Sequence, residues 1–329
     1  MPTQSQLKIV FMGTPEFAVE SLKAIVNAGY FVPAVVTVPD KPAGRGQRVS
    51  QSAVKSFAVE HEIEVLQPEK LKDQQFIDQL TRIEPDIFVV VAFRMLPEAV
   101  WRIPRLGTFN LHASLLPQYR GAAPINWSII NGETKTGLTT FLIDSSIDTG
   151  NIILSKEVSI DPNETAGELH DRMLVLGADL VLTTIELIAS KNFKAISQES
   201  FVAQHDVLKP APKLYKDICK VDWNKPALQV HNLIRGLSPY PGAWANLTNG
   251  NGDVISVKLM RSTILNRNRN SNTDKPGTLI TNGKTFLHVH CGLGSISIDE
   301  MQLPGKRNLT IKDLLMGFRG IESYRFESF

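Results

Sequence analysis

The 329-residue sequence contains only two cysteines, Cys219 and Cys291. Two thiols cannot form a disulfide framework or a cysteine-rich zinc site, so both are expected to be reduced and to have no part in catalysis. No uninterrupted apolar segment approaches the roughly 20 residues of a membrane helix. Residues 1–6 lack the basic and apolar regions of a signal peptide. We therefore expect a cytoplasmic protein with no membrane association.

The sequence also lacks the three spaced glycines of a dinucleotide-binding fingerprint. Only Gly13 follows the first predicted strand, and the bulky Glu16 and Phe17 would crowd a pyrophosphate there. Pro15 instead suits the first turn of a helix, whose N-terminus can still offer backbone N–H groups to an anion. A nicotinamide-dependent oxidoreductase is therefore disfavoured, although it remains an alternative at the level of the fold.

The chain as a whole has little excess of either charge, since its net charge is only +2. The two parts of the chain nevertheless differ. Residues 1–205 carry 18 basic and 23 acidic side chains, a net charge of −5, whereas residues 206–329 carry 17 and 10, a net charge of +7. A basic C-terminal part suits contact with a polyanion such as RNA, although an ordinary solvated surface explains the same balance.

Alternating strand and helix patterns run through the first part of the chain. Strands are predicted at 7–12, 31–38, 86–93, 107–112, 137–144 and 152–160, and helices at 15–28, 52–61 and 165–189. Residues 87–92 are apolar at every position, as expected for a strand in the middle of a sheet that is covered on both faces. The pattern predicts an α/β, Rossmann-like domain with a mostly parallel sheet.

The pattern changes after residue 205. Residues 206–216 contain Pro210 and Pro212, which favour an extended linker. Beyond the linker lie a helix candidate at 227–235, short strand candidates separated by turns such as 249–252 and 281–283, and a polar surface loop at 266–272. Because one core rarely serves a chain of this length, we expect two domains, residues 1–205 and a smaller C-terminal OB-like β-barrel at 217–329.

Residues 39–48 are expected to form a long loop that is rich in glycine, proline and basic side chains. Lys41, Arg45 and Arg48 suit contact with phosphates, and Gly44 and Gly46 would allow the loop to change shape on binding. Loops of this length are often binding elements, but a solvated loop accounts for the same composition. The segment does not decide the function by itself.

The densest chemical signal lies at the end of the predicted strand 107–112. Asn110 and His112 are two residues apart, so their side chains leave the same face of the strand. An amide beside an imidazole can stabilise a developing charge, although the two also suit a structural pair. The next strand end offers a carboxylate to His112 from Asp144 or Asp148. The spacing does not choose between these two carboxylates.

Together these segments resemble the folate-dependent formyltransferases. The resemblance rests on Asn110-x-His112, Ser114-Leu115-Leu116-Pro117, Arg120-Gly121 and Asp148-Thr149-Gly150. It extends over most of the chain through Phe11-x-Gly13-Thr14-Pro15-x-Phe17, Pro42-Ala43-Gly44-Arg45-Gly46 and Gly121-Ala122-Ala123-Pro124. These further motifs and the C-terminal extension are similar to those of the members that formylate methionyl initiator tRNA.

The resemblance implies a reaction and its site residues. The formyl group would pass from 10-formyltetrahydrofolate to the amino group of methionine on initiator tRNA, without a metal, and we expect a monomer. The catalytic residues would be Asn110, His112 and Asp148, which selects Asp148 over Asp144. Folate contacts would come from Ser114, Leu115, Leu116 and Pro117, and from Val91, Phe93, Met95 and Leu96. Contacts with tRNA would come from Lys41, Arg45, Arg48 and Lys213, and from the C-terminal barrel.

One departure from the family pattern concerns the folate loop. Residues 92–97, Ala-Phe-Arg-Met-Leu-Pro, are one residue shorter than the segment of many members, so its contacts are expected to differ locally. Arg94 would reach the acidic tail of folate or lie in solvent. Two other functions stay open: formylation of a small amine, such as an amino-sugar nucleotide, and RNA binding by a chain with an inactive catalytic domain. The intact Asn110, His112 and Asp148 disfavour the second.

Overall fold

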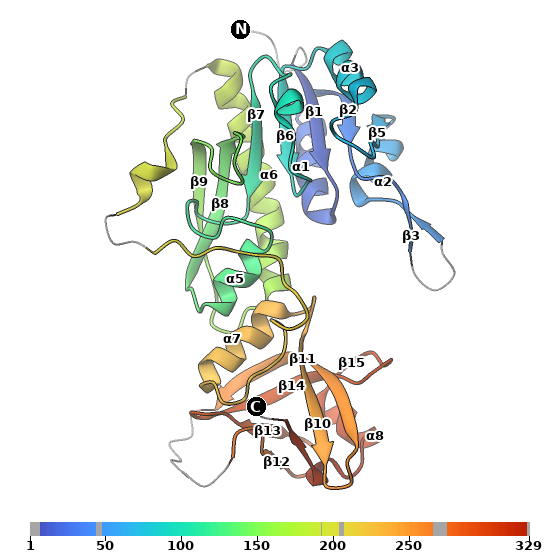
Figure 1. Ribbon diagram of the computed structural model, residues 1–329, viewed down its shortest axis with the longest axis vertical. Coiled ribbons are helices and arrows are strands. Elements are labelled where there is room, and N and C mark those ends of the chain that lie inside the picture. The colour runs from blue at the N-terminus through green and yellow to red at the C-terminus, as the bar shows by residue number, and fades with distance from the viewer. Residues whose placement is uncertain (1–6, 44–47, 192, 204–206, 266–274, 328–329) are drawn as a thin grey trace. The chain divides into compact units, whose positions relative to one another are not determined.

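In a computed structural model, the protein is described at residues 7–43, 48–191, 193–203, 207–265 and 275–327 (Figure 1). Contacts within the chain divide it into two compact units. Unit 1 comprises Met1–Gly121, Thr136–Val158 and His170–Pro210, and unit 2 comprises Ala122–Lys135, Ser159–Leu169 and Ala211–Phe329. The units therefore interleave along the sequence.

Unit 1 is built on a seven-stranded sheet. Its strands are β1 (Lys8–Gly13), β2 (Phe31–Val36), β5 (Glu64–Leu66), β6 (Ile87–Val91), β7 (Thr108–His112), β8 (Lys135–Leu142) and β9 (Ile152–Ser159), in the order β5-β2-β1-β6-β7-β8-β9. The pairs from β5 to β7 are parallel, whereas β8 is antiparallel to β7. β6 is central and all its residues are buried, as its apolar sequence predicts. The predicted Rossmann-like, mostly parallel architecture is confirmed.

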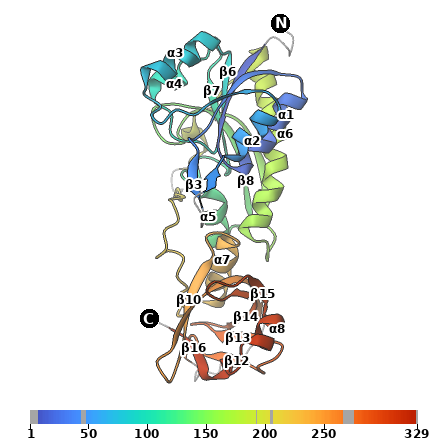
Figure 2. The same ribbon diagram turned by 90° about the vertical axis from the view of Figure 1, so that its right-hand side faces the viewer.

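Helices cover both faces of this sheet. Unit 1 contains α1 (Glu16–Asn27), α2 (Ala53–Glu60), α3 (Gln74–Ile83), α4 (Glu98–Trp101), most of α6 (Ala166–Ser190) and the 3-10 helix η2 (Gln198–Phe201). α3 and α4 lie on one face, and α1 and α6 on the other (Figure 2). On the first face, Phe76 and Leu80 of α3 pack with Val10, Phe88 and Val90 of the sheet. The central strands are thus removed from water on both sides.

Among the described residues, α6 is the one helix that is long and apolar enough to cross a membrane. Its most apolar window has a mean hydropathy of 1.8, and 44% of that window is buried inside the protein. The sequence pattern predicted a helix at 165–189, and charged side chains such as Asp171, Arg172 and Asp179 interrupt its apolar residues. Its apolar side chains recur at helical spacing, and those at most 2% exposed are Leu169, Met173, Val181, Ile185 and Ile188. Within unit 1 the helix lies against the sheet, where Thr184 Oγ1 is 2.8 Å from Thr140 Oγ1 of β8, so packing there buries the stripe from Met173 to Ile188.

The segment expected to be a long loop is a hairpin. β3 (Lys41–Ala43) and β4 (Arg48–Ser50) pair antiparallel, while residues 44–47, which include Arg45, lie outside the described residues. At the base of the hairpin, Lys55 Nζ donates to Asp40 Oδ2 (2.5 Å) and Gln67 Nε2 donates to Asp40 Oδ1 (2.8 Å). These hydrogen bonds, that of Lys55 above all, hold the pKa of the Asp40 carboxyl below its ordinary value. Strand pairing overrode the loop-like composition.

Unit 2 is built on an antiparallel sheet. Its strands are β10 (Ala243–Asn249), β11 (Val254–Leu265), β12 (Leu279–Thr281), β13 (Leu287–His290), β14 (Ser295–Gln302), β15 (Asn308–Thr310) and β16 (Tyr324–Phe326), in the order β12-β13-β14-β11-β10-β16 with β15 on β14. Phe326 N donates to Gly277 O (2.9 Å), which draws the two ends of the sheet together. The predicted C-terminal barrel is confirmed. The predicted loop 266–272 lies outside the described residues.

The helices of unit 2 are α5 (Pro124–Ile130), α7 (Ala227–Leu237), α8 (Ile311–Gly317) and the 3-10 helix η3 (Ile321–Ser323). Asn126 Nδ2 of α5 donates to the Gly236 carbonyl of α7 (2.8 Å). Arg235 Nη1 of α7 donates to the carbonyls of Asp161 (3.3 Å) and Glu164 (3.1 Å), and burial lowers the pKa of the Arg235 guanidinium. α7 therefore joins the barrel to segments from much earlier in the chain.

Both cysteines lie in unit 2, where they are free and buried. Burial raises the pKa of the Cys219 thiol and raises that of Cys291 to about 12. Both thiols are therefore neutral at physiological pH, and a neutral thiol is a poor nucleophile.

Candidate active site

His112 is a buried imidazole at the end of β7, with 7% of its side chain exposed. Its Nε2 lies 2.8 Å from the backbone carbonyl oxygen of Tyr119. Because a carbonyl only accepts, Nε2 carries a proton in this arrangement. Nδ1 faces Asp148 Oδ2 at 3.8 Å, too far for a direct hydrogen bond. One ring nitrogen is thus held by the fold, and the other is turned toward a carboxylate.

Asp148 reaches His112 from the loop between β8 and β9. Its backbone is left-handed, with φ of 55°, and Asp148 Oδ2 accepts from Gly121 N (2.9 Å). Asp144 instead binds its own loop, since its Oδ1 accepts from Ser146 N (2.9 Å) and Thr149 Oγ1 (2.8 Å). The geometry therefore brings Asp148 and His112 together and leaves Asp144 as a turn residue, in keeping with the choice that the resemblance implied.

Asn110 precedes His112 by two residues on β7, which places its side chain on the same face of the strand. The side chain is partly buried, and none of the described residues forms a hydrogen bond with it. An amide in this position is available to donate to a ligand beside His112.

Residues 119–121 hold both members of the His112–Asp148 pair. Tyr119 accepts the Nε2 hydrogen bond, and its own N–H donates to Lys209 O (2.7 Å). Tyr119 has φ of 60° and Gly121 has φ of 126°. The φ of residue 121 is one that only glycine adopts without strain, so the turn needs a glycine there. The Arg120-Gly121 motif by itself does not indicate that backbone atoms of this turn position the pair.

The run Ser114 to Pro117 is fixed against β8. Ser114 Oγ donates to Gln118 O (2.6 Å), and the side chain of Ser114 is fully buried. Thr139 Oγ1 of β8 donates to Ser114 O (2.7 Å) and accepts from Leu116 N (3.2 Å). Leu115 is partly buried, whereas Leu116 and Pro117 are buried. The buried members of the run present backbone more than side chain to any ligand.

The other predicted folate contacts lie at and after the end of β6. Val91 is fully buried and Leu96 is 6% exposed, whereas Phe93 is partly exposed and Met95 is 72% exposed. Phe93 and Met95 therefore offer side-chain surface in this loop.

The Arg94 guanidinium binds the segment that follows β5. Its Nη2 donates to Pro68 O (2.9 Å), its Nη1 donates to Glu69 O (3.1 Å), and its guanidinium lies 5.2 Å from the Phe93 ring centre. Burial lowers the pKa of this guanidinium. Neighbouring carbonyls thus hold Nη1 and Nη2, whereas the buried Nε has no hydrogen-bond partner among the described residues.

The basic residues predicted to contact tRNA are distributed over both units. Lys41 is exposed on β3, and Arg48 lies on β4. Lys213 belongs to unit 2, where it is exposed and its Nζ lies 5.8 Å from the Tyr215 ring centre. Across the described ranges, no group of three His, Cys, Asp or Glu side chains is arranged to hold a metal ion.

The imidazole and the free amide lie on one face of β7, and the carboxylate faces the imidazole from the loop between β8 and β9. The chain that holds them belongs to the formyl transferase family of enzymes. The profile described as formyl transferase matches residues 7–185, and that of the formyl transferase C-terminal domain matches residues 213–319. Relatives similar over nearly their whole length are named methionyl-tRNA formyltransferases. The methionyl-tRNA formyltransferase of Bacteroides fragilis is 48% identical over 325 residues, covering 99% of both chains. That of Flavobacterium johnsoniae is 48% identical over 312 residues, covering 95% of this chain and 96% of the relative.

Solved structures share the fold at lower identity. The sugar 3N-formyl transferase WlaRD, determined in the presence of dTDP and 5-N-formyl-THF, superposes with a TM-score of 0.63 and 23% identity, covering 92% of this chain and 99% of that chain. HypX from Aquifex aeolicus in complex with tetrahydrofolic acid gives a TM-score of 0.62 and 17% identity, covering 96% of this chain and 48% of that chain. These likenesses concern the fold alone.

Proposed function

We propose that the protein transfers the formyl group of 10-formyltetrahydrofolate to the α-amino group of methionine on initiator tRNA, as a monomer in the cytoplasm. The observation that carries the proposal is the His112–Asp148 pair beside the free Asn110 amide, in a chain 48% identical over 99% of its length to a methionyl-tRNA formyltransferase. Residues 1–205 would act as the catalytic domain, 206–216 as a linker and 217–329 as the tRNA-binding domain. A small amine as acceptor is disfavoured, because relatives 47–48% identical over 98–99% of this chain are methionyl-tRNA formyltransferases.

In the proposed reaction, the methionyl amine attacks the formyl carbon and gives a tetrahedral intermediate with a negative oxygen. Asn110 and His112 would donate to that oxygen, and each such donor lowers the barrier by about 3–4 kcal/mol in oxyanion holes. Because Nε2 is bound to Tyr119 O, only Nδ1 of His112 is free to exchange a proton with the reactants. Asp148, directly or through water, would accept the amine proton. Asp148 would pass this proton to Nδ1 of His112, and the imidazolium so formed would donate from Nδ1 to the tetrahedral oxygen and then give the proton to folate N10 as the C–N10 bond breaks, leaving tetrahydrofolate and formylmethionyl-tRNA.

The folate would lie along the residues that follow β6 and β7. Ser114, Leu116, Pro117, Val91 and Leu96 are buried, so their contribution would come mainly from backbone groups and from the walls they form. The partly buried Leu115 and the more exposed Phe93 and Met95 would add side-chain contacts to the pterin or its tail.

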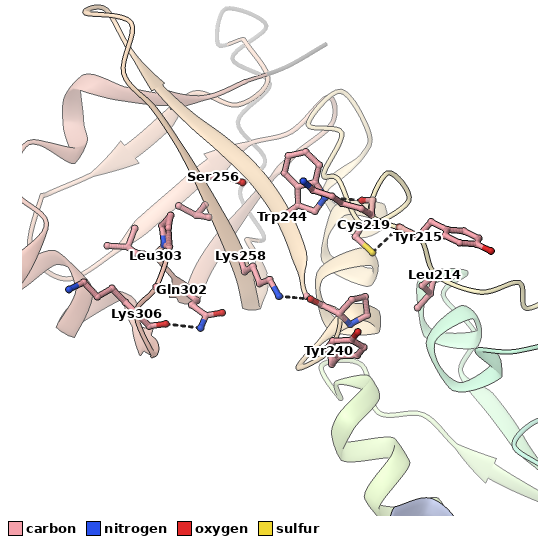
Figure 3. A pocket seen from close by; sticks show the side chains of 16 residues that line it. Leu214, Tyr215, Cys219, Tyr240, Trp244, Ser256, Lys258, Gln302, Leu303 and Lys306 are labelled. Carbon is pink, nitrogen blue, oxygen red and sulfur yellow. Dashed lines mark hydrogen bonds between the residues drawn. The ribbon is translucent and has the colours of Figure 1, made fainter. Parts of the chain in front are cut away.

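The tRNA would contact Lys41 and Arg48 of the hairpin, Arg45, the exposed Lys213, and a cavity of about 550 Å³ in unit 2 (Figure 3). Three lysines and three aromatic side chains line the cavity, namely Lys216, Lys258, Lys306, Tyr215, Tyr240 and Trp244. None of its lining residues is acidic. The Nζ atoms of Lys216 and Lys220 lie 5.3 Å and 5.2 Å from the Trp244 ring centre. Cations beside rings suit the phosphates and sugars of RNA.

The proposal is tested by incubating the purified protein with 10-formyltetrahydrofolate and methionyl initiator tRNA and measuring formylmethionine. Free methionine, elongator methionyl-tRNA and an amino-sugar nucleotide serve as competing acceptors. We expect transfer to initiator tRNA alone. Transfer to the amino sugar and not to tRNA would replace the proposal with the small-amine function.

Substitution of the basic residues tests the tRNA surface. Lys213→Ala and Arg45→Ala should each raise KM for tRNA several-fold and leave kcat within about twofold, because phosphate contacts supply affinity and not chemistry. The slope of log affinity against log salt should become shallower by about one for each charge removed. Lys23→Ala, on the exposed face of α1, is the matched control and should change neither quantity. An unchanged KM in both variants would remove these residues from the tRNA surface.

A further inference from the structure

Gln198 is a buried glutamine beside the His112–Asp148 pair, and no sequence motif pointed to it. It is the first residue of η2 and is 2% exposed. Its segment is fixed to β9, because Ile152 and Ile196 exchange two backbone hydrogen bonds of 2.8 Å. The glutamine side chain therefore extends from an anchored backbone.

The Gln198 amide connects two loops. Its Nε2 donates to Asp148 O (2.9 Å) and to Gly150 O (2.8 Å). Its Oε1 accepts from Arg120 Nε (3.1 Å) and Arg120 Nη2 (2.7 Å). A primary amide has two N–H groups and two lone pairs, so these four hydrogen bonds use its full capacity. A buried amide that is satisfied in this way has one orientation.

The two loops are those that hold the catalytic pair. Arg120 lies between Tyr119, whose carbonyl holds His112 Nε2, and Gly121, whose N–H holds the Asp148 carboxylate. Asp148 itself has a left-handed backbone, which persists in a non-glycine residue only where surrounding contacts impose it. Gln198 binds the carbonyl of Asp148 and Gly121 binds its carboxylate, so the residue is held from two sides.

We propose that Gln198 is a positioning residue, which fixes the Asp148 carboxylate relative to His112 Nδ1 by tying the Asp148 loop to Arg120. The inference rests on the proposed formyl transfer and on the role of Asp148 in it. Gln198 touches neither ring nitrogen of His112 and acts through Asp148. The four hydrogen bonds of Gln198 thus form a brace between the Asp148 loop and Arg120. A displacement of about 1 Å in a reacting group costs on the order of 10²-fold in rate, so loss of this brace should slow turnover although Gln198 binds neither substrate.

Two substitutions of nearly equal volume test the brace. Gln198→Met removes all four hydrogen bonds, whereas Gln198→Glu keeps the acceptor for Arg120 and replaces the donor to the two carbonyls by a repelling oxygen. We expect each variant to lower kcat on the order of 10²-fold and to change KM for tRNA and folate by less than about threefold. Gln198→Glu should lower the melting temperature less than Gln198→Met, because its ion pair with Arg120 remains. It therefore carries the test if Gln198→Met does not fold.

Gln118→Met is the matched control, because Gln118 also binds a neighbouring segment through its amide but makes no hydrogen bond to the Asp148 loop. Its Oε1 accepts from Lys209 N (2.9 Å) and its Nε2 donates to Val207 O (3.4 Å). The control should keep kcat within about twofold of the unaltered protein. A loss of kcat in Gln118→Met equal to that in Gln198→Met would indicate general loosening and overturn the inference.

A double-mutant cycle separates positioning from a merely structural role. If Gln198 acts through Asp148, Gln198→Met should cause little further loss of kcat in an Asp148→Asn background. A full additional loss there, or a normal kcat in both folded Gln198 variants, would refute the brace. A crystal structure of Gln198→Met should show the Asp148 carboxylate displaced from Gly121 N. That readout needs no activity, so it still tests the brace if the unaltered protein fails to formylate tRNA.

Discussion

Replacing His112 by alanine should lower kcat on the order of 10⁴-fold while the affinity for tRNA changes less than about threefold. The imidazole would supply one donor to the tetrahedral oxygen and one proton to the leaving nitrogen, and each contribution is worth about 10²-fold or more in enzymes. Asp148→Ala should have a similar effect, since it removes the carboxylate that faces Nδ1 at 3.8 Å. Steady-state kinetics and filter binding of methionyl-tRNA measure the two quantities separately.

His61→Ala is a suitable control for this experiment. His61 lies at the end of α2, stacked on Phe57 with ring centres 3.9 Å apart and with its Nδ1 near Phe57 O. Its loss should leave kcat unchanged. If His112→Ala weakens tRNA binding as much as it slows turnover, the imidazole serves binding and not the transition state.

Replacing Gly150 by alanine should damage both the fold and the reaction. A Cβ there would overlap the carbonyl oxygen of Leu142 and approach a Phe141 ring carbon to 3.4 Å. The main obstacle is backbone, which cannot turn aside as a side chain does. We expect the free energy of unfolding to fall by about 2–3 kcal/mol, as in other overpacked sites. Because Asp148 lies two residues earlier, kcat should also fall on the order of 10²-fold.

Urea denaturation and initial rates measure the two effects of Gly150→Ala. Gly250→Ala provides the comparison, because no atom lies within 4 Å of a Cβ built at Gly250. That variant should match the unaltered protein in stability and rate. Equal behaviour of both alanine variants would show that the β8–β9 loop adapts freely, and would remove the steric argument for its rigidity.

Periodicity in the sequence predicted the strands that carry the site, but not which carboxylate faces His112. The apolar run 87–92 gave the central strand, and the two-residue spacing placed Asn110 and His112 on one face of β7. Spacing did not separate Asp144 from Asp148, because the distinction depends on a left-handed backbone that residue type does not reveal. Local patterns fix strands and faces, whereas the choice of carboxylate depends on how a loop folds back.

Contacts between distant segments account for what the sequence did not show. Gln198 reaches Asp148 across 50 positions, through the pairing of Ile196 with β9. Arg94 Nη1 and Nη2 donate to carbonyls 25 and 26 positions away, which no local pattern indicates. The sequence predicted a loop where β3 and β4 pair, because glycine and proline favour turns. Strand pairing depends on both short strands together, and neither one indicates it alone.

The interleaving of the two units limits how the molecule can be rearranged. A cut near residue 205 would leave α5 and residues 159–169 attached to unit 1, although they pack with the barrel through Asn126 and through the carbonyls that Arg235 binds. The barrel is therefore not a detachable module. A chimera that exchanges C-terminal halves between relatives must carry these two inserted segments with it, and recombination at the linker alone breaks a shared interior.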